Sequence, residues 1–339
     1  MTAGGMGGSI CVLGGGSWGT ALARHLAVGG ARVRLWAHEP EVVEAITNDH
    51  ANPLFLPGFD LPPSLSATTS IEEACSGAEV TLVAVPSHFC RDVLGRARAP
   101  LGERPEVVVA SKGIENGTLL RVSEIAAEIL REARPRIAVL SGPSFAREVA
   151  AGRPTAIVAA SAEPDLAARV QALLSFANLR VYTSGDPAGV ELGGALKNVI
   201  AIAAGAVEGL GLGPNTLAAL ITRGLAEISR LAAALGGRRE TLAGLSGLGD
   251  LVLTCTGALS RNRQVGIEIA RGRSLEQIEA ATRTVAEGIR TARAARDLGR
   301  RAGVEMPITE KVHEVLFEGK PAADAIRDLL GRPPRPERD

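Results

Sequence analysis

The first half of the chain alternates short apolar runs with longer segments that have helical spacing of apolar residues. Seven runs have the length and composition of buried strands, and helical patterns lie between most of them. This alternation predicts an α/β fold with a Rossmann-type, doubly wound and mostly parallel sheet. The predicted strands are 9–13, 32–36, 80–85, 107–110, 137–140, 156–159 and 179–182, and the predicted helices are 18–28, 88–96, 119–131 and 164–175.

Two regions depart from this alternation. Residues 52–69 are interrupted by Pro and Gly, which predicts a loop without regular structure. After about Asp186 the strand-like runs stop, and apolar residues recur at three- and four-residue steps along one helix face. The pattern therefore predicts a first domain at 1–188, an all-α C-terminal domain at 189–331 and a disordered, Pro-rich tail at 332–339. The helix face contains Leu217, Leu220, Ile221, Leu225, Ile228, Leu231 and Leu235.

The first predicted strand leads directly into a glycine-rich turn that opens the first predicted helix. Gly14, Gly16 and Gly19 have the spacing Gly-x-Gly-x-x-Gly, in the strand–turn–helix context that this motif requires. Such glycines permit a tight turn and close approach of the backbone to a pyrophosphate, whose charge the helix N-terminus stabilises. We therefore predict a dinucleotide-binding domain at 1–188, with Ser17 and Trp18 in contact with the cofactor.

The end of the second predicted strand leaves the identity of the dinucleotide open. An NAD site often has an acid at this point to bind the ribose hydroxyls. Here His38 stands before Glu39, and no acid occupies the strand end itself. His38 can face a 2′-phosphate, which favours NADPH somewhat over NADH, whereas Glu39 keeps NAD as an alternative. His38 can equally be a solvated loop residue.

Lys197 is the only basic residue in a stretch, 192–202, that otherwise has the composition of a buried helix. Removing an ammonium group from water is costly unless partners or a reaction use it. A lysine in this position can hold a substrate oxygen, donate a proton to it or form a Schiff base. The alternative is structural, with the stem on the core and the head in solvent, and this segment alone favours that alternative.

Five further segments are unusually rich in small and polar residues. The first three each follow a predicted strand, where an open α/β sheet has its ligand crevice. Lys112, beside Gly113 at such a strand end, is therefore expected in the active site rather than on a surface loop. Ser260, Arg261 and Asn262 offer donors suited to a phosphate, although such a run alone is more typical of an exposed helix cap. The segments are 83–88, 110–113, 141–148, 247–250 and 260–263.

Composition and charge narrow the classes of function. The 37 basic and 37 acidic residues cancel, so net charge favours neither nucleic acid nor an anionic membrane as a partner. Residues 1–8 do not resemble a signal peptide, and no apolar run approaches the ~20 residues of a membrane span. The cysteines show no metal-binding spacing, which predicts no metal site and reduced, mostly buried thiols in a cytoplasmic protein. They are Cys11, Cys75, Cys90 and Cys255.

Taken together, the motifs resemble those of the bacterial-type NAD(P)-dependent glycerol-3-phosphate dehydrogenases. They occur in the family's order from about Ile10 to Gly331, so only the two ends of the chain lie outside the resemblance. The resemblance implies reduction of dihydroxyacetone phosphate to sn-glycerol 3-phosphate, the precursor for glycerophospholipid synthesis. The matching segments are 14–19, 52–58, 85–87, 111–113, 141–146, 196–198, 247–255, 260–263 and 306–308.

The resemblance also implies a role for individual residues. Lys197 would be the catalytic acid/base, with Asp250 and Lys112 beside it. Segment 284–287 departs mildly from the family's pattern, which weakens the assignment of Val285. The implied substrate contacts are Lys112, Gly142, Ser144, Lys197, Asp250, Ser260, Arg261 and Asn262. The predicted cofactor contacts, from the glycine motif and the resemblance, are Gly14, Gly16, Ser17, Trp18, Gly19, His38, Lys112, Ala146, Arg261, Val285 and Glu287.

These residue types suit the chemistry of ketone reduction. Hydride addition leaves negative charge on the carbonyl oxygen, and an ammonium such as that of Lys197 can stabilise it and supply the proton. One alternative is a dehydrogenase with the same plan that acts on a hydroxyacyl or ketopantoate-like carboxylate. Another is a redox sensor that binds dinucleotide without turnover, although a sensor needs no proton donor. Analogy suggests a homodimer through the helical domain.

Overall fold

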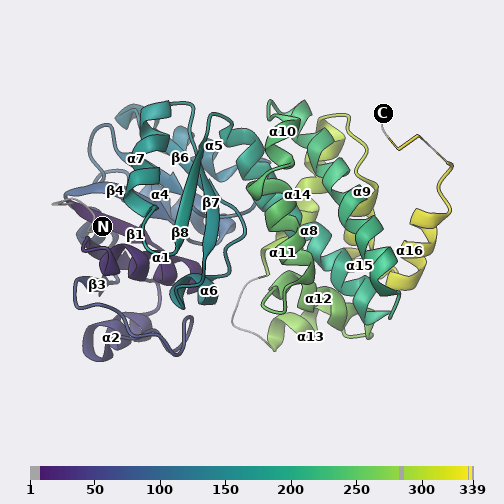
Figure 1. Ribbon diagram of the computed structural model, residues 1–339, viewed down its shortest axis with the longest axis horizontal. Helices are drawn as coiled ribbons and strands as arrows, with labels where there is room; N and C mark the ends of the chain where they lie inside the picture. Colours follow the sequence, from purple (N-terminus) through teal and green to yellow (C-terminus); the bar gives the residue numbers. More distant parts are fainter. Residues whose placement is uncertain (1–7, 282–285, 335, 338–339) are drawn as a thin grey trace.

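A computed structural model describes residues 8–281, 286–334 and 336–337 of the chain. A twisted sheet flanked by helices forms one half of the molecule, and a bundle of helices forms the other (Figure 1). The sheet has eight strands in the order β3-β2-β1-β4-β5-β6-β7-β8, and all neighbours are parallel except β6 and β7. The strands are β1 Ser9–Leu13, β2 Arg32–Trp36, β3 Leu65–Thr68, β4 Ala78–Val83, β5 Glu106–Val109, β6 Arg136–Ser141, β7 Thr155–Ala160 and β8 Leu179–Ser184.

The predicted α/β class and Rossmann-type sheet are confirmed, but the prediction that residues 52–69 lack regular structure is wrong. This segment contains β3, which pairs in parallel with β2 at the edge of the sheet. An edge strand has only one partner and can be short and partly polar. Leu65 is buried while Ser66 is exposed, so β3 lacks the continuous apolar pattern of the central strands.

Helices cover both faces of the sheet because its strands alternate their side chains between two cores. On β1, Ile10 and Val12 pack in one core together with α1 and α7, whereas Cys11 and Leu13 pack in the other with α4 and α5. The four cysteines are buried and unbridged. The helices of this half are α1 Ser17–Val28, α2 Pro40–Asp49, α3 Ile71–Cys75, α4 Cys90–Ala97, α5 Val122–Ile129, α6 Ala146–Ala150 and α7 Pro164–Leu174, with the short turns η1 Ser87–Phe89 and η2 Arg131–Ala133.

The other half of the molecule is helical in its described residues and is built around α8 Pro187–Gly209, which packs against α9, α11, α12, α14 and α15. At 332–334 and 336–337 the chain has neither helix nor strand. The remaining elements are α9 Gly213–Ala234, α10 Arg239–Leu242, the π turn η3 Leu245–Gly249, α11 Asp250–Thr256, α12 Arg261–Ala270, α13 Leu275–Ala280, α14 Glu287–Arg301, α15 Pro307–Phe317 and α16 Ala322–Leu330.

By length and composition, helix α8 is long and apolar enough to cross a membrane. The prediction that no apolar run approaches the length of a membrane span did not identify this helix. Within the fold, however, 89% of its most apolar window is buried, so α8 is the core helix of the bundle. Two glycines let α8 and α12 touch backbone to backbone. A Cβ at Gly205 would lie 1.9 Å from the carbonyl oxygen of Arg263, and one at Gly266 would lie 1.9 Å from that of Ile202.

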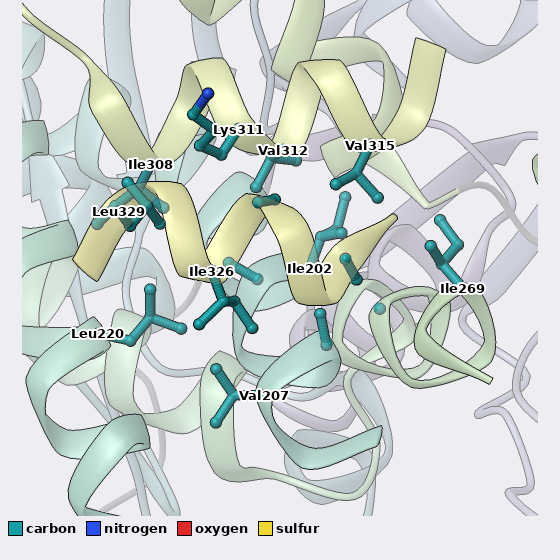
Figure 2. Close-up of a pocket in the computed structure, with 15 residues that line it drawn as sticks. Ile202, Val207, Leu220, Ile269, Ile308, Lys311, Val312, Val315, Ile326 and Leu329 are labelled. Atoms are coloured by element: carbon teal, nitrogen blue, oxygen red, sulfur yellow. The ribbon is translucent and has the colours of Figure 1, made fainter. Parts of the chain in front are cut away.

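A small apolar cavity of about 50 Å³ lies between the C-terminal part of α8 and helices α9, α12, α15 and α16 (Figure 2). Lys311 contributes only its stem, since its amino group bonds Glu314 and Asp328. The cavity contains none of the predicted site residues. Its lining is Ile202, Ala203, Ala206, Val207, Leu220, Gly266, Ile269, Ile308, Lys311, Val312, Val315, Ala322, Ala325, Ile326 and Leu329.

Candidate active site

The glycine turn between β1 and α1 has the shape that a pyrophosphate requires. Gly14 has φ +129°, and a Cβ there would lie 2.8 Å from the backbone of Ala84. A Cβ at Gly19 would lie 1.9 Å from the carbonyl oxygen of Gly14, so the turn can close only with glycine at both positions. Gly16 faces open space, and no side chain caps the N-terminus of α1. The free backbone N–H groups of this turn therefore fit an anionic ligand.

The other predicted contacts near this turn are only partly free. Ser17 donates its hydroxyl to the carbonyl oxygen of Phe55 at 2.7 Å. The indole nitrogen of Trp18 is buried and has no hydrogen-bond partner among the described residues. His38 is exposed beyond the end of β2. Asn52, outside the predicted set, is buried and donates to the carbonyl oxygen of Gly15 at 2.9 Å, so it holds the turn in place.

Lys197 lies in the middle of α8 and is only 6% exposed. Its ammonium group donates to Asp250 Oδ1 and, at 2.8 Å, to the hydroxyl of Thr254. Lys112, which follows β5, donates to Asp250 Oδ2 at 2.8 Å from the opposite side. One buried carboxylate thus joins two lysines from the two halves of the molecule. The structural alternative, in which the head of Lys197 reaches solvent, is wrong.

This arrangement moves the pKa of both buried groups. Burial lowers the pKa of Lys197 to about 7, and the nearby charge of Lys112 adds to that effect, while Asp250 opposes it. Burial alone would raise the pKa of Asp250, but the two ammonium groups outweigh it and hold that pKa below its usual value. Lys197 can therefore exchange a proton near neutral pH, and Asp250 stays ionised.

The end of β6 contributes the next predicted residues. Lys112 lies 3.4 Å from the carbonyl oxygen of Gly142, and the Ser144 hydroxyl donates to the same oxygen at 2.9 Å. Gly142 has φ +137° and is buried. Ala146 begins the short helix α6 two residues beyond Ser144. Gly142 and Ser144 are thus connected to the lysine pair through hydrogen bonds.

The predicted phosphate-binding residues lie at the start of α12, and their side chains differ in their hydrogen-bond partners. The Ser260 hydroxyl accepts from the backbone N–H of Arg263 at 3.2 Å, so Ser260 is a helix cap. Asn262 donates to Asn198 at 3.0 Å and accepts from the backbone N–H of Gly288 at 2.9 Å. Arg261 is exposed and has no hydrogen bond or ion pair with any described residue. Among these three side chains, the guanidinium of Arg261 is the one left free for a ligand.

Glu287, at the start of α14, is held from the other half of the molecule. Its carboxylate accepts from the backbone N–H of Ser87 at 3.2 Å and from the Ser87 hydroxyl at 2.8 Å. Val285, also predicted as a cofactor contact, lies outside the described residues.

Three residues that contact this network were absent from the predicted site. Thr254 binds the Lys197 ammonium, Asn198 binds Asn262, and Ser87 binds Glu287. Thr254 follows Asp250 by one helical turn, and this spacing is a signal that could have identified it. Asn198 and Ser87 lie in segments already noted for their motifs, but their partners are 64 and 200 residues away.

Comparison with known proteins agrees with this architecture. Residues 9–167 match the family model described as NAD-dependent glycerol-3-phosphate dehydrogenase N-terminus, and residues 186–327 match its C-terminal counterpart. A glycerol-3-phosphate dehydrogenase [NAD(P)+] of Geobacter sulfurreducens is 54% identical over 332 residues, covering 97% of this chain and 98% of the relative.

Solved structures show the same similarity. The crystal structure of a glycerol-3-phosphate dehydrogenase from Coxiella burnetii superposes with a TM-score of 0.92 at 39% identity, covering 96% of this chain and 99% of that one. A PanE/ApbA family ketopantoate reductase from Ralstonia eutropha reaches a TM-score of 0.62 at 18% identity, over 94% of this chain and 99% of its own, and shares the fold alone.

Proposed function

The chain belongs to the family of NAD-dependent glycerol-3-phosphate dehydrogenases, and from this premise we propose that it is an NAD(P)-dependent sn-glycerol-3-phosphate dehydrogenase. It reversibly reduces C2 of dihydroxyacetone phosphate to give sn-glycerol 3-phosphate, a precursor for glycerophospholipids. The observation that carries the proposal is the buried ammonium of Lys197, held between Asp250 and Thr254. A sensor that binds dinucleotide without turnover has no need of such a proton donor.

Lys197 is the proposed acid/base of the reaction. When bound, the nicotinamide would supply the hydride. The Lys197 ammonium donates two of its three protons to Asp250 and Thr254, which leaves the third for the carbonyl oxygen of the substrate. A pKa of about 7 lets the same amine give up that proton and recover it near neutral pH. Asp250 orients both lysines, and Lys112 places a second positive charge beside the developing oxyanion.

The substrate phosphate is proposed to bind at the N-terminus of α12. The free guanidinium of Arg261 can bind phosphate with two hydrogen bonds, and the N-terminus of a helix also favours an anion. Ser260 and Asn262 shape this terminus, since both side chains already have partners. Gly142 and Ser144 lie beside Lys112 and complete the proposed substrate contacts.

The cofactor is proposed to lie along the glycine turn. Gly14, Gly16 and Gly19 leave room for the pyrophosphate. No acid stands at the end of β2 itself, so NADPH is somewhat favoured, although Glu39 beside His38 keeps NADH in the comparison. The further proposed contacts are Ser17, Trp18, His38, Lys112, Ala146, Arg261, Val285 and Glu287.

The proposal extends to the domains, the compartment and the oligomeric state. We propose a dinucleotide-binding domain at 1–188, a helical substrate domain at 189–331 and a tail at 332–339; the start of α8 at Pro187, two residues before the proposed boundary, supports the division. The reduced, buried state expected of the four cysteines favours the cytoplasm. A homodimer through the helical half is proposed by analogy, and sedimentation of the purified protein would test it.

The direct test is the choice of substrate. Purified protein is mixed with NADPH or NADH and with either dihydroxyacetone phosphate or a 2-keto acid such as ketopantoate. Cofactor oxidation is followed as the loss of absorbance at about 340 nm, where reduced nicotinamide absorbs. We expect turnover with dihydroxyacetone phosphate, faster with NADPH. Turnover with the keto acid alone would show that the proposed substrate is wrong.

Arg261 provides a separate test of the phosphate site. Arg261→Ala should raise the KM for dihydroxyacetone phosphate on the order of tenfold or more, because a charge-assisted bond is lost. Arg263→Ala is the matched control, since Arg263 lies two residues away and is paired with Glu208. An unchanged KM in Arg261→Ala, or an equal rise in both variants, would remove Arg261 from the phosphate site.

A further inference from the structure

Two serine–glutamate contacts of the same geometry join the two halves of the molecule. In each, one carboxylate accepts both the backbone N–H and the hydroxyl of one serine. Glu287 of α14 accepts from Ser87, the first residue of η1, at 3.2 and 2.8 Å. Glu191 of α8 accepts from Ser123 in the first turn of α5, with 2.8 Å to the backbone N–H. In both, a carboxylate of the helical half binds the start of a helical turn in the sheet half.

The two contacts have different surroundings. Ser87 closes the segment that begins at Ala84, whose backbone packs against Gly14 of the glycine turn. On its other side, a Cβ at Gly113 would lie 2.4 Å from the Ser87 hydroxyl and 3.1 Å from Glu287 Oε2. Gly113 directly follows Lys112. The Ser87–Glu287 contact therefore lies against the residue that follows Lys112, and Ser87 is three residues along the chain from the backbone that packs on the proposed cofactor turn.

The second contact is surrounded by ordinary structural partners. Glu191 is 3% exposed and also forms an ion pair with Arg121 at 3.4 Å. Ser123 and Arg121 both belong to the start of α5, and neither is a predicted site residue. The pair at Glu191 thus has the same hydrogen bonds as the pair at Glu287, but it lies away from the proposed cofactor contacts in the bonding network.

Glu287 is partly buried, and Ser87 supplies two hydrogen bonds to its carboxylate. Burial raises its pKa, while Ser87 and the positive charges of Arg261 and Arg290 act in the opposite direction. Ser87 uses one acceptor position on each carboxylate oxygen. The remaining acceptor positions can receive hydroxyl or amide protons, which are the donors that the ribose and carboxamide groups of a nicotinamide dinucleotide carry.

We propose that Ser87 is a positioning residue for the dinucleotide: it fixes the Glu287 carboxylate, and with it the first turn of α14, over the cofactor site. The proposal rests on the proposed function, because it assumes that the glycine turn binds a nicotinamide dinucleotide. Ser87 acts through Glu287 and touches neither the substrate nor the reacting atoms. Its loss should therefore change cofactor affinity rather than the chemical step.

The test is equilibrium binding of NADPH and NADH, measured by cofactor fluorescence with the full-length wild-type protein, Ser87→Ala and Glu287→Gln. We expect Ser87→Ala to raise the Kd for NADPH about tenfold, the size of one lost hydrogen bond to a charged group. At saturating NADPH, kcat and the KM for dihydroxyacetone phosphate should stay within about threefold of wild type. The double variant should bind no more weakly than the weaker single variant, because Ser87 acts through Glu287.

Ser123→Ala is the matched control, since it removes the same hydroxyl bond from the other contact. We expect it to lower the thermal midpoint at least as much as Ser87→Ala but to leave the Kd for NADPH within twofold, roughly the scatter of such measurements. An unchanged Kd in Ser87→Ala, or an equal rise in Ser123→Ala, would overturn the positioning role alone. A wild-type protein that bound neither dinucleotide would overturn the proposed function as well.

Discussion

The middle and the C-terminal part of helix α8 bury opposite kinds of surface. In the middle of the helix, Lys197 shares the buried carboxylate of Asp250 with Lys112. Further along, the helix lines an apolar cavity with Ile202 and Val207 (Figure 2). The same helix therefore carries a buried charge network and the lining of an apolar cavity.

The contrast separates what the fold needs from what the reaction needs. Burying an ammonium and a carboxylate costs desolvation that their mutual attraction often only just offsets, and apolar replacements can be neutral or stabilising. A fold selected for stability alone would have no use for Lys197 in a core helix. The apolar C-terminal part of α8 buries no charge. The cavity there should lower the free energy of unfolding by only about 1 kcal/mol.

The largest expected effect concerns Lys197 in the middle of α8. Lys197→Ala should lose activity by a factor on the order of 10² or more, since the proton donor is gone. The variant should still fold and bind cofactor, because Asp250 keeps its bond to Lys112. Steady-state kinetics and NADPH binding would check both statements. Lys311 of α15 lines the apolar cavity, and Lys311→Ala should keep wild-type turnover. Near-normal turnover of Lys197→Ala would refute the acid/base role.

A smaller effect should follow from loosening the same ammonium. Thr254 accepts from Lys197 at 2.8 Å and donates to the carbonyl oxygen of Asp250 at 2.6 Å. Thr254→Val keeps the shape but leaves one ammonium proton without a partner, so kcat should fall about tenfold with little change in KM. Thr254→Ser should retain most of the rate. If the valine variant turned over like wild type, Thr254 would have no part in orienting the amine.

The pH dependence of the two reaction directions should have opposite signs. Reduction requires protonated Lys197, whose pKa is about 7, so its rate should fall about fivefold from pH 7 to pH 8. Oxidation of glycerol 3-phosphate requires the neutral amine and should rise over the same interval. Parallel profiles in the two directions would mean that another group carries the proton.

The lowered pKa of Lys197 also has a consequence for stability. Above pH 7 the folded state loses the Lys197 proton while the unfolded state keeps it until about pH 10.5. Since the unfolded state then binds more protons, the contribution of Lys197 to the free energy of unfolding should rise with pH across this window. Lys197→Met should remove that rise, which urea unfolding at several pH values would measure.

Sequence patterns predicted the parts of the molecule that depend on local order. Strand-like runs and glycine spacing identify the sheet and the turn at Gly14, because both signals lie in residues that are close together in the sequence. The edge strand β3 was not predicted, because a strand with a single neighbour does not need a continuous apolar pattern. The membrane-like composition of α8 could be interpreted only once its surroundings were known.

The residues of the site and the pairing of Lys197 with Asp250 were predictable, but the other bonds of the network were not. Lys197 stands out in the sequence because it is a charge in an apolar helix. Nothing in the sequence shows that Asp250 serves two lysines or that Ser87 holds Glu287, since these partners are brought together by the packing of the two halves. Ser260 is a helix cap in the fold, which is the alternative that its sequence segment alone favoured.

The smallest expected effect concerns the apolar C-terminal part of α8. Ala325 of α16 lines the cavity, so Ala325→Val places two methyl groups in the cavity and should raise the free energy of unfolding by about 0.5–1 kcal/mol. Ala294→Val is the matched control in the closed core of α14, where overpacking should cost about 1–3 kcal/mol. Urea unfolding would measure both, and Ala325→Val should keep wild-type kcat because the cavity contains none of the site residues. Equal destabilisation by the two substitutions would mean that α16 closes the cavity in solution. The two parts of α8 would then differ only in the charges that they bury.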